Sequence, residues 1–276
     1  MARMVSRSIV GITALIAGLT CQVGVSATAS KQHTRLDPEA TVSALTTMPD
    51  LRGQPAGTER KTAFLTLLMP IIKSQNARIE ADRKWLIAAR DHEHWTPQAG
   101  ARFDTLSKRY GLKYSSHQRD EIDWERLLSR VDIIPTSMVL VQAIEESGWG
   151  TSRFARESNN LFGMRCFGKA CGVAQRGVDD ADAQRFQHFS SIEENVRAYL
   201  LNLNTHFAYE GLRQQRANLR SKGKDVSAHT LIAALERYSE RGTDYLAQLR
   251  SLLATNAPLI ERMHKNDRLV ANNSAV

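Results

Sequence analysis

Two adjacent carboxylates, Glu145 and Glu146, stand at the end of an apolar segment in the sequence VQAIEESGWG. The residues before them are apolar almost all the way round a helix, which predicts a core helix over residues 136–147. Gly148 is a natural terminator for that helix. Gln142 and Glu146 are four residues apart, so they share its one polar face. The sequence therefore predicts a carboxylate at the end of a buried helix.

A carboxylate in that position can act as a general acid. Burial disfavours the charged form, so the pKa of Glu146 should rise above the usual value of about 4.3. A carboxyl group that stays protonated near neutral pH can protonate the leaving oxygen in glycoside hydrolysis. Trp149 and Phe162 could line the cleft, because sugar faces pack on aromatic rings. The alternative is structural: Glu146 would cap a turn or pair with Arg153 or Arg165.

A longer stretch around these residues, AIEESGWGTSRFARESNNLFGMRCF, resembles the signature of the bacterial peptidoglycan-cleaving N-acetylglucosaminidases. The likeness is sharp over about residues 136–167 and is greatest to the Bax-like subgroup. It continues more loosely toward the C-terminus, through LERYSERGTDYLAQL. Glu-Ser-Gly-Trp-Gly followed by Asn-Asn-Leu-Phe-Gly is a specific combination, whereas either piece alone would be a weaker signal.

The resemblance implies a mainly α fold, a lysozyme-like helical domain with a small β lobe across the cleft. It implies that the acid is Glu146 and not Glu145. It also implies a catalytic role for Tyr238, which could position the acetamido group of the substrate or could be a core residue. The residues expected to contact the substrate are Gln142, Trp149, Asn160 and Phe162.

The β lobe raises the question of a second carboxylate. Many members of this family carry a second Glu there, and this sequence has none. Asp182 best matches the acidic position, although its side chain is one methylene shorter and it could belong to a solvated acidic turn. If no second carboxylate takes part, the N-acetyl group of the substrate could assist, as it does in some glycosidases.

The N-terminus has the pattern of a secretory signal peptide over residues 1–29. Arg3 and Arg7 precede an apolar run from about residue 9 to residue 19, and small residues follow. A membrane-spanning anchor would need about 20 apolar residues, so we expect no stable membrane anchor. The mature protein should reach the periplasm or the cell surface, or be secreted.

Export affects how the cysteines are interpreted. After cleavage only Cys166 and Cys171 remain, and in an oxidising compartment a pair this close favours a disulfide. Half of a metal site or two free thiols are the alternatives, but no second cysteine pair exists to complete a zinc site. His92 and His94 are two residues apart and would not face each other on a helix. We therefore expect no metal and no cofactor.

The rest of the chain divides by its periodicity. Residues 30–58 contain prolines and little pattern, which predicts a linker or a poorly ordered arm. A helical N-terminal extension is expected over 59–119, where Pro70 should kink or break the first helix. The catalytic domain is expected over 120–263 and a loose tail over 264–276.

The formal net charge is +8, and the basic residues are scattered without a run of five. This pattern argues against a dedicated nucleic-acid arm. A basic surface suits an anionic wall polymer, but many ordinary soluble proteins have one too. We expect a monomer whose partner is the polysaccharide peptidoglycan.

These observations together predict an exported endo-β-N-acetylglucosaminidase, which cuts the β-1,4 bond on the reducing side of N-acetylglucosamine in peptidoglycan. Two alternatives remain open from the sequence. One is a muramidase or lytic transglycosylase that cuts the other bond of the same polymer. The other is a non-catalytic protein for cell-wall binding or assembly.

Overall fold

The structure is a computed structural model that describes residues 47–167, 171–175, 177, 184–236 and 238–273, with only the backbone of 267–273. All of them belong to one unit, Leu36–Val276. The predicted signal peptide, most of the predicted arm and Asp182 lie outside the described residues.

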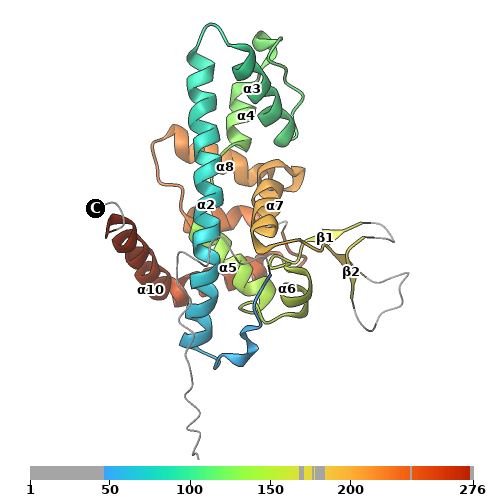
Figure 1. The fold of residues 1–276 in the computed structure, drawn as a ribbon, viewed down its shortest axis with the longest axis vertical. Helices are drawn as coiled ribbons and strands as arrows, with labels where there is room; N and C mark the ends of the chain where they lie inside the picture. Colours follow the sequence, from blue (N-terminus) through green and yellow to red (C-terminus); the bar gives the residue numbers. More distant parts are fainter. Residues whose placement is uncertain (1–46, 168–170, 176, 178–183, 237, 274–276) are drawn as a thin grey trace, which may run out of the picture. The chain divides into compact units, whose positions relative to one another are not determined.

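Helices make up most of the described chain (Figure 1). The α-helices are α2 (Thr58–Asp91), α3 (Pro97–Arg109), α4 (Trp124–Arg130), α5 (Thr136–Ser147), α6 (Arg153–Ser158), α7 (Ile192–Thr205), α8 (Glu210–Ser221), α9 (Ala228–Leu231) and α10 (Thr243–Asn273). The 3-10 helices are η1 (Leu51–Gly53), η2 (Arg119–Glu121), η3 (Phe207–Tyr209) and η4 (Ile232–Leu235). Strands β1 (Arg165–Cys166), β2 (Val173–Ala174) and β3 (Arg185–Phe186) form an antiparallel sheet in the order β1-β3-β2. The predicted mainly α fold with a small β lobe is confirmed.

Helix α5 has the predicted bounds and is buried along most of its length. Every residue from Met138 to Ile144 is at most 2% exposed. Such a helix needs neighbours on several sides, and α5 packs against α2, α9 and α10. It begins after Pro135, and it ends at Gly148, whose φ of +56° is in the left-handed region that glycine favours.

Helix α2 is a single helix of 34 residues that passes through Pro70. We predicted that Pro70 would kink or break this helix, and the helix continues through it without a break. Phe64 and Leu68 before Pro70, and Ile72 after it, are fully buried in the same core. Because most helical stability in proteins comes from such packing, it outweighs the one backbone hydrogen bond that proline cannot make.

The predicted N-terminal extension and the end of the predicted arm share this core. Met48 is 5% exposed, and its backbone N–H donates to Oδ1 of Asn159 at 2.8 Å. A Cβ atom added to Gly150 would lie only 2.1 Å from the terminal methyl group of Met48. Gly150 also has a φ of +75°, so both its backbone and its neighbour require glycine.

Helix α10 packs on α5, η4 and α2. It runs to Asn273, which is inside the segment predicted as a tail. Within the described part of the chain, no helix combines the length and the apolar character that crossing a membrane would need.

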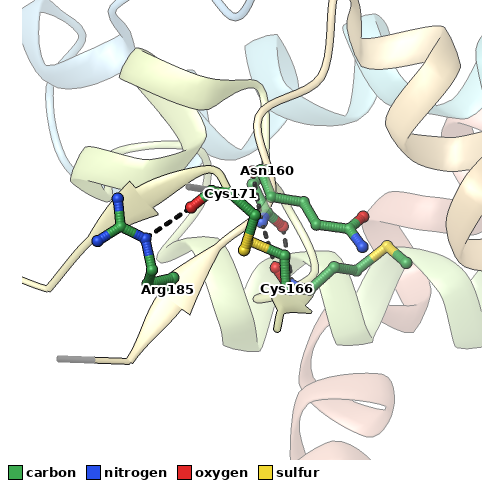
Figure 2. Close-up of a disulfide and its surroundings, with 6 residues drawn as sticks. Asn160, Cys166, Cys171 and Arg185 are labelled. Atoms are coloured by element: carbon green, nitrogen blue, oxygen red, sulfur yellow. Dashed lines mark hydrogen bonds between the residues drawn. A yellow bond between two sulfur atoms is a disulfide. The ribbon is translucent and has the colours of Figure 1, made fainter. Parts of the chain in front are cut away.

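The β lobe is held by side-chain bonds more than by its two-residue strands. Cys166 and Cys171 form the predicted disulfide, which joins the end of β1 to the turn before β2 (Figure 2). Nε of Arg185 on β3 donates to the carbonyl oxygen of Cys171 at 2.7 Å. Gly172 passes close to β3, because a Cβ there would lie 1.9 Å from the carbonyl oxygen of Phe186.

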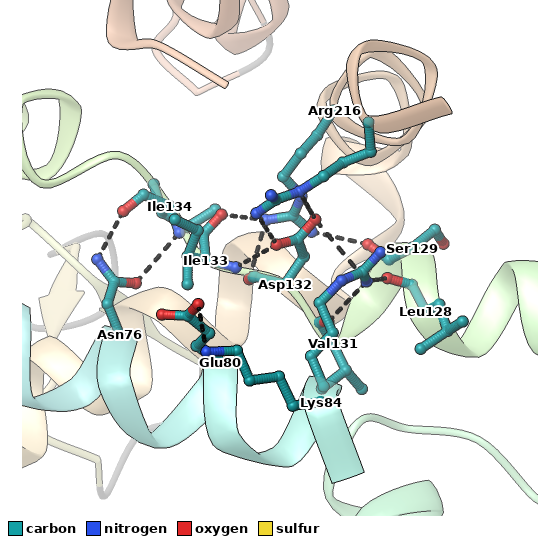
Figure 3. A network of polar contacts seen from close by, with 12 residues as sticks. Asn76, Glu80, Lys84, Leu128, Ser129, Val131, Asp132, Ile133, Ile134 and Arg216 are labelled. Atoms are coloured by element: carbon teal, nitrogen blue, oxygen red, sulfur yellow. Dashed lines mark hydrogen bonds and ion pairs between the residues drawn. The ribbon is translucent and has the colours of Figure 1, made fainter. Parts of the chain in front are cut away.

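A buried cluster of charges joins α2 and α8 to the segment that leads into α5 (Figure 3). Its centre is Asp132, which is 1% exposed. Arg220 donates to both carboxylate oxygens, at 3.1 and 2.8 Å. Nitrogens of Arg216 and Arg83 lie 3.7 and 3.8 Å from Oδ2. Three guanidinium groups therefore surround one carboxylate.

Arg216 is fully buried and binds the backbone before α5. It donates to the carbonyl oxygens of Ser129 and Ile133 at 2.7 and 2.9 Å, and to Oδ1 of Asn204 at 2.8 Å. Burial lowers its pKa to about 10, so it remains a cation at neutral pH. The cluster thereby fixes the chain immediately before the helix that carries Glu146.

Candidate active site

A cleft of about 1210 Å³ opens where the C-terminal end of α5 meets the β lobe. Glu146, Phe162 and Tyr238 line it, as predicted for residues near the substrate. The β lobe contributes one wall, which includes Arg165 and Phe167. Residues near η3 and residues before α10 complete the lining.

Glu146 lies in this cleft, where the hydroxyl of Tyr245 and, through its charge, Arg241 act on its carboxyl group. Burial has the largest effect on its carboxyl group and raises the pKa above the usual 4.5. A hydrogen bond from Tyr245 opposes this shift, and the charge of Glu145 adds to it. Of the two cations considered as structural partners, Arg153 pairs with Glu157 and Arg165 pairs with Glu240.

Glu145, the neighbouring carboxylate, has a different environment. Oε1 of Glu145 accepts from Nη1 of Arg241 at 2.8 Å. The Glu145 carboxylate is thus held in an ion pair with a basic side chain. Of the two adjacent acids, Glu146 is thus the one whose surroundings favour the protonated form.

Gln142 lies one turn before Glu146 and is fully buried behind the cleft. Its Nε2 donates to the hydroxyl of Tyr245 at 3.2 Å, and its Oε1 accepts from the hydroxyl of Tyr199. Tyr245 is also the residue that hydrogen-bonds to Glu146. Gln142, predicted to contact the substrate, therefore orients the tyrosine that holds the acid.

Stacked aromatic rings surround the acid and account for its apolar environment. Tyr238 stacks on Tyr245 with ring centroids 5.5 Å apart, and Phe162 stacks on Tyr199 at 3.8 Å. The Tyr238 hydroxyl donates to the carbonyl oxygen of Phe162 at 2.8 Å. That hydroxyl oxygen keeps lone pairs that can accept a hydrogen bond from a ligand.

Gly163 brings the backbone directly against the acid. It has a φ of +61°, and a Cβ at this position would lie 3.2 Å from Oε2 of Glu146. A larger residue would therefore strain the backbone and press on the carboxylate. The glycine that ends the Asn-Asn-Leu-Phe-Gly motif thus has a physical reason to be there.

Trp149 was predicted to line the cleft, and the structure places it elsewhere. Its φ is +60°, which is unusual for a bulky residue. The ring packs edge-on against Phe64 of α2, with centroids 5.7 Å apart, and Nζ of Lys61 lies 5.1 Å from its centroid. The left-handed turn after α5 places this ring against α2, where it packs on the edge of the hydrophobic core.

Asn160 was predicted to contact the substrate, but it is buried, at 1% exposure. Its Nδ2 donates to the carbonyl oxygens of Met164 and Gln187 at 2.8 and 3.0 Å, and its Oδ1 accepts from the backbone N–H of Met164 at 2.9 Å. Figure 2 shows it beside the disulfide. Asn160 therefore joins the two sides of the β lobe and fixes the wall that faces Glu146.

Several residues of the site were missed by sequence reasoning. Tyr245, Arg241, Glu240 and His206 all lie in the cleft or contact its two acids. A partial signal existed for three of them, which flank the predicted Tyr238 in the sequence ERYSERGTDY. His206 gave none, because a lone histidine at the end of a helix carries no motif.

The predicted second carboxylate, Asp182, lies outside the described residues. Among the residues that the structure does describe, no group of three or more His, Cys, Asp and Glu side chains is arranged to hold a metal ion.

Comparisons with known proteins show the family of the chain. The sequence model of the glucosaminidase family, described as mannosyl-glycoprotein endo-beta-N-acetylglucosaminidase, matches residues 122–257, which include the acid and the tyrosines around it. Protein bax of Escherichia coli (strain K12) is 47% identical over 213 residues, which cover 77% of this chain and 76% of that protein. No solved structure matches the chain. The chain therefore belongs to the glucosaminidase family, in the subgroup that contains protein bax.

Proposed function

We propose that this protein is an exported endo-β-N-acetylglucosaminidase that cleaves the glycan strands of peptidoglycan, with Glu146 as general acid. The observation that carries the proposal is a carboxyl group in an open cleft whose pKa is raised by burial, although Tyr245 and the charge of Arg241 oppose the shift. Membership of a glucosaminidase family supports the bond class, because the family description names an endo-beta-N-acetylglucosaminidase. The resemblance to bacterial wall enzymes favours peptidoglycan as the polymer.

In the first step, protonated Glu146 gives its proton to the glycosidic oxygen as the bond from that oxygen to C1 breaks. The departing sugar leaves with a hydroxyl group, and Glu146 is left as a carboxylate. The carboxylate then takes a proton from the water that attacks C1, which restores the acid and completes hydrolysis. Tyr245 can keep its hydrogen bond to Glu146 in both states.

The group that stabilises C1 between these events is either Asp182 or the carbonyl oxygen of the substrate's own N-acetyl group. Tyr238 supports the second route. Its hydroxyl donates to the carbonyl of Phe162, so its free lone pairs can accept the N–H of the acetamido group and turn the acetamido oxygen toward C1.

The disulfide supports the proposed location. A bond between Cys166 and Cys171 persists in the periplasm or outside the cell, whereas cytosolic thiols are kept reduced. Together with the predicted signal peptide, it favours a protein that meets peptidoglycan after export.

Product analysis of digested peptidoglycan tests the activity. Purified sacculi are incubated with the protein, and the sugar at each new reducing end is identified by reduction and mass spectrometry. We expect N-acetylglucosamine ends, and none with Glu146→Gln. N-acetylmuramic acid ends would make the protein a muramidase, and anhydro ends a lytic transglycosylase. Binding without any cleavage would make it a wall-binding protein.

The same assay separates the two routes for stabilising C1. If the N-acetyl group assists, Asp182→Asn should reduce turnover far less than Glu146→Gln. Equal losses in two folded variants would instead make Asp182 a full catalytic partner and would remove the reason to invoke the substrate's own oxygen.

A further inference from the structure

Two large apolar side chains are strongly exposed in the described part of the chain, Phe167 at 93% and Phe207 at 75%. Single exposed apolar residues are common, so exposure alone carries little weight. Their positions relative to the cleft that holds Glu146 are informative. Phe167 lines the cleft, and the ring of Phe207 packs on His206, which also lines it.

Phe167 is presented by a fixed backbone. It directly follows Cys166, which is held by the disulfide to Cys171 and by the pairing of β1 with Arg185 on β3. A ring on such a backbone loses little conformational freedom when a ligand covers it. The ring is not packed in the hydrophobic core, since nearly all of its surface is exposed to solvent.

Phe207 is held in a comparable way at a different part of the cleft. It is the first residue of η3, and its ring centroid lies 4.4 Å from that of His206. Nδ1 of His206 accepts from the backbone N–H of Ala208 at 3.3 Å, and its carbonyl accepts from the buried Arg213 at 2.8 Å. The rim around Phe207 is therefore fixed by hydrogen bonds before any ligand arrives.

The chemistry of the cleft indicates what covers these rings. The lining of the cleft is mixed, and it includes the charged pair Arg165 and Glu240 and the amides of Gln187 and Asn202. A protein partner would favour a large exposed apolar patch, whereas Phe167 and Phe207 are the only large apolar side chains that are strongly exposed in the described part of the chain. A glycan has apolar ring faces and polar edges, so it matches isolated aromatic rings set among hydrogen-bonding groups.

We propose that Phe167 and Phe207 are outer sugar-stacking positions of the cleft, which make long glycan strands bind more tightly than short oligomers. The inference rests on the proposed function and adds to it a dependence on strand length. Sugars stacked there are remote from the bond that breaks, and binding energy from remote groups can be used to orient and distort the reacting sugar.

A binding experiment tests this without requiring catalysis. Glu146→Gln protein, which cannot consume its ligand, is titrated with purified peptidoglycan sacculi and with soluble β-1,4-linked N-acetylglucosamine oligomers. Adding Phe167→Ala or Phe207→Ala should weaken binding to sacculi by roughly three- to tenfold each. The loss should be smaller for a disaccharide than for a hexasaccharide.

Matched substitutions separate stacking from simple apolar contact. Phe167→Trp and Phe207→Trp should retain binding, and Phe167→Leu and Phe207→Leu should lose it, because leucine is apolar but has no flat face. Unchanged binding in both alanine variants would overturn the proposal, and so would leucine variants that bind as well as the parent. A change only in self-association would assign the rings to a protein interface and would also overturn it.

Kinetics of the active protein distinguish this inference from the proposed function. With Glu146 intact, the alanine variants should lower kcat/KM more for long strands than for short ones. If the active protein cleaves nothing but sacculus binding still depends on both rings, the proposed catalysis fails while the glycan contacts stand. If cleavage occurs and strand length has the same effect in every variant, the inference fails while the proposed function stands.

Discussion

Asp132 is buried and Glu146 is partly buried at the cleft, and the surroundings of the two carboxylates are opposite. Asp132 is surrounded by Arg83, Arg216 and Arg220, so three positive charges lie around one negative charge. Glu146 is surrounded by tyrosine and phenylalanine rings, and its hydrogen-bond donor is a neutral hydroxyl. The two sites lie at opposite ends of the same stretch of chain, just before α5 and at its C-terminal end.

The contrast separates a carboxylate that holds a fold together from one that can give up and take back a proton. Arginine never loses its proton in a protein, so a carboxylate bonded to several arginines is held in place by them. A carboxylate among aromatic rings has little to stabilise its charge, so its proton is retained and can be transferred. The aromatic rings around Glu146 are thus as informative as the three guanidinium groups around Asp132.

The largest expected effect is on turnover in Glu146→Gln. Turnover should fall by roughly two to four decades, because glutamine keeps the size of the side chain but has no proton to transfer. Glu145→Gln is the matched control one residue away, and it should retain most activity because its carboxylate is already paired with Arg241. If the Glu145 variant is the inactive one, the roles of the two acids are reversed.

Stability of the Glu146 variant checks the same comparison. Burial raises the folded-state pKa of Glu146, so the charged form costs folding free energy above the unfolded-state pKa near 4.5. Glu146→Gln should therefore melt at the same temperature as the wild type or higher at neutral pH, and the difference should disappear in acid. Loss of activity through unfolding would instead make Glu146 a structural residue.

The next effect in size is on folding in Asp132→Asn. Removing this charge leaves three buried or half-buried guanidinium groups without their carboxylate, and the free energy of unfolding should fall by about 3–5 kcal/mol. Glu80→Gln is a suitable control, since Glu80 forms an exposed pair with Lys84 at 3.0 Å and should cost under about 1 kcal/mol (Figure 3). Chemical denaturation measures the free energy of unfolding of both variants. Equal decreases would contradict the conclusion that Asp132 stabilises the fold more than an exposed ion pair does.

A smaller effect is expected on the pH profile of Tyr245→Phe. The Tyr245 hydrogen bond lowers the pKa of Glu146, so its removal should raise that pKa further. Since a general acid works only while protonated, the basic limb of kcat/KM should move to higher pH. Tyr199→Phe, which loses only its bond to Gln142, should move the limb less. A shift to lower pH in Tyr245→Phe would contradict the proposed orientation of this bond.

The smallest effect concerns the disulfide of the β lobe. The loop it closes is short, with a sequence separation of 5, so replacing both Cys166 and Cys171 by serine should lower the free energy of unfolding by only about 2 kcal/mol. Unreduced, denatured mature protein should show no titratable thiol. Two thiols would mean that the lobe is held by Asn160 and Arg185 alone.

Features that depend on neighbouring residues could be predicted from the sequence. The bounds of α5, its end at Gly148 and the shared face of Gln142 and Glu146 follow from local periodicity and from the backbone freedom of glycine. The disulfide between Cys166 and Cys171 followed in the same way from a short separation and the expectation of export.

Features that depend on distant segments could not be predicted. Tyr245 and Arg241, which set the environments of the two acids, come from a segment about a hundred residues further along the chain. We predicted that Trp149 lines the cleft because aromatic rings often bind sugars. Its position is instead determined by its left-handed backbone conformation and by packing against Phe64 of α2. Tertiary packing likewise carries α2 through Pro70.

The contact of Met48 with Asn159 and Gly150 also has a practical consequence for preparing the protein. Regular helical periodicity begins at Glu59, which would invite a shortened version of the chain that starts there. Such a version would leave a hole beside Phe64, and Asn159 would lose the backbone donor that it now binds. An N-terminal boundary upstream of Met48 keeps this contact with the turn that follows α5, so trimming and tagging belong before that residue.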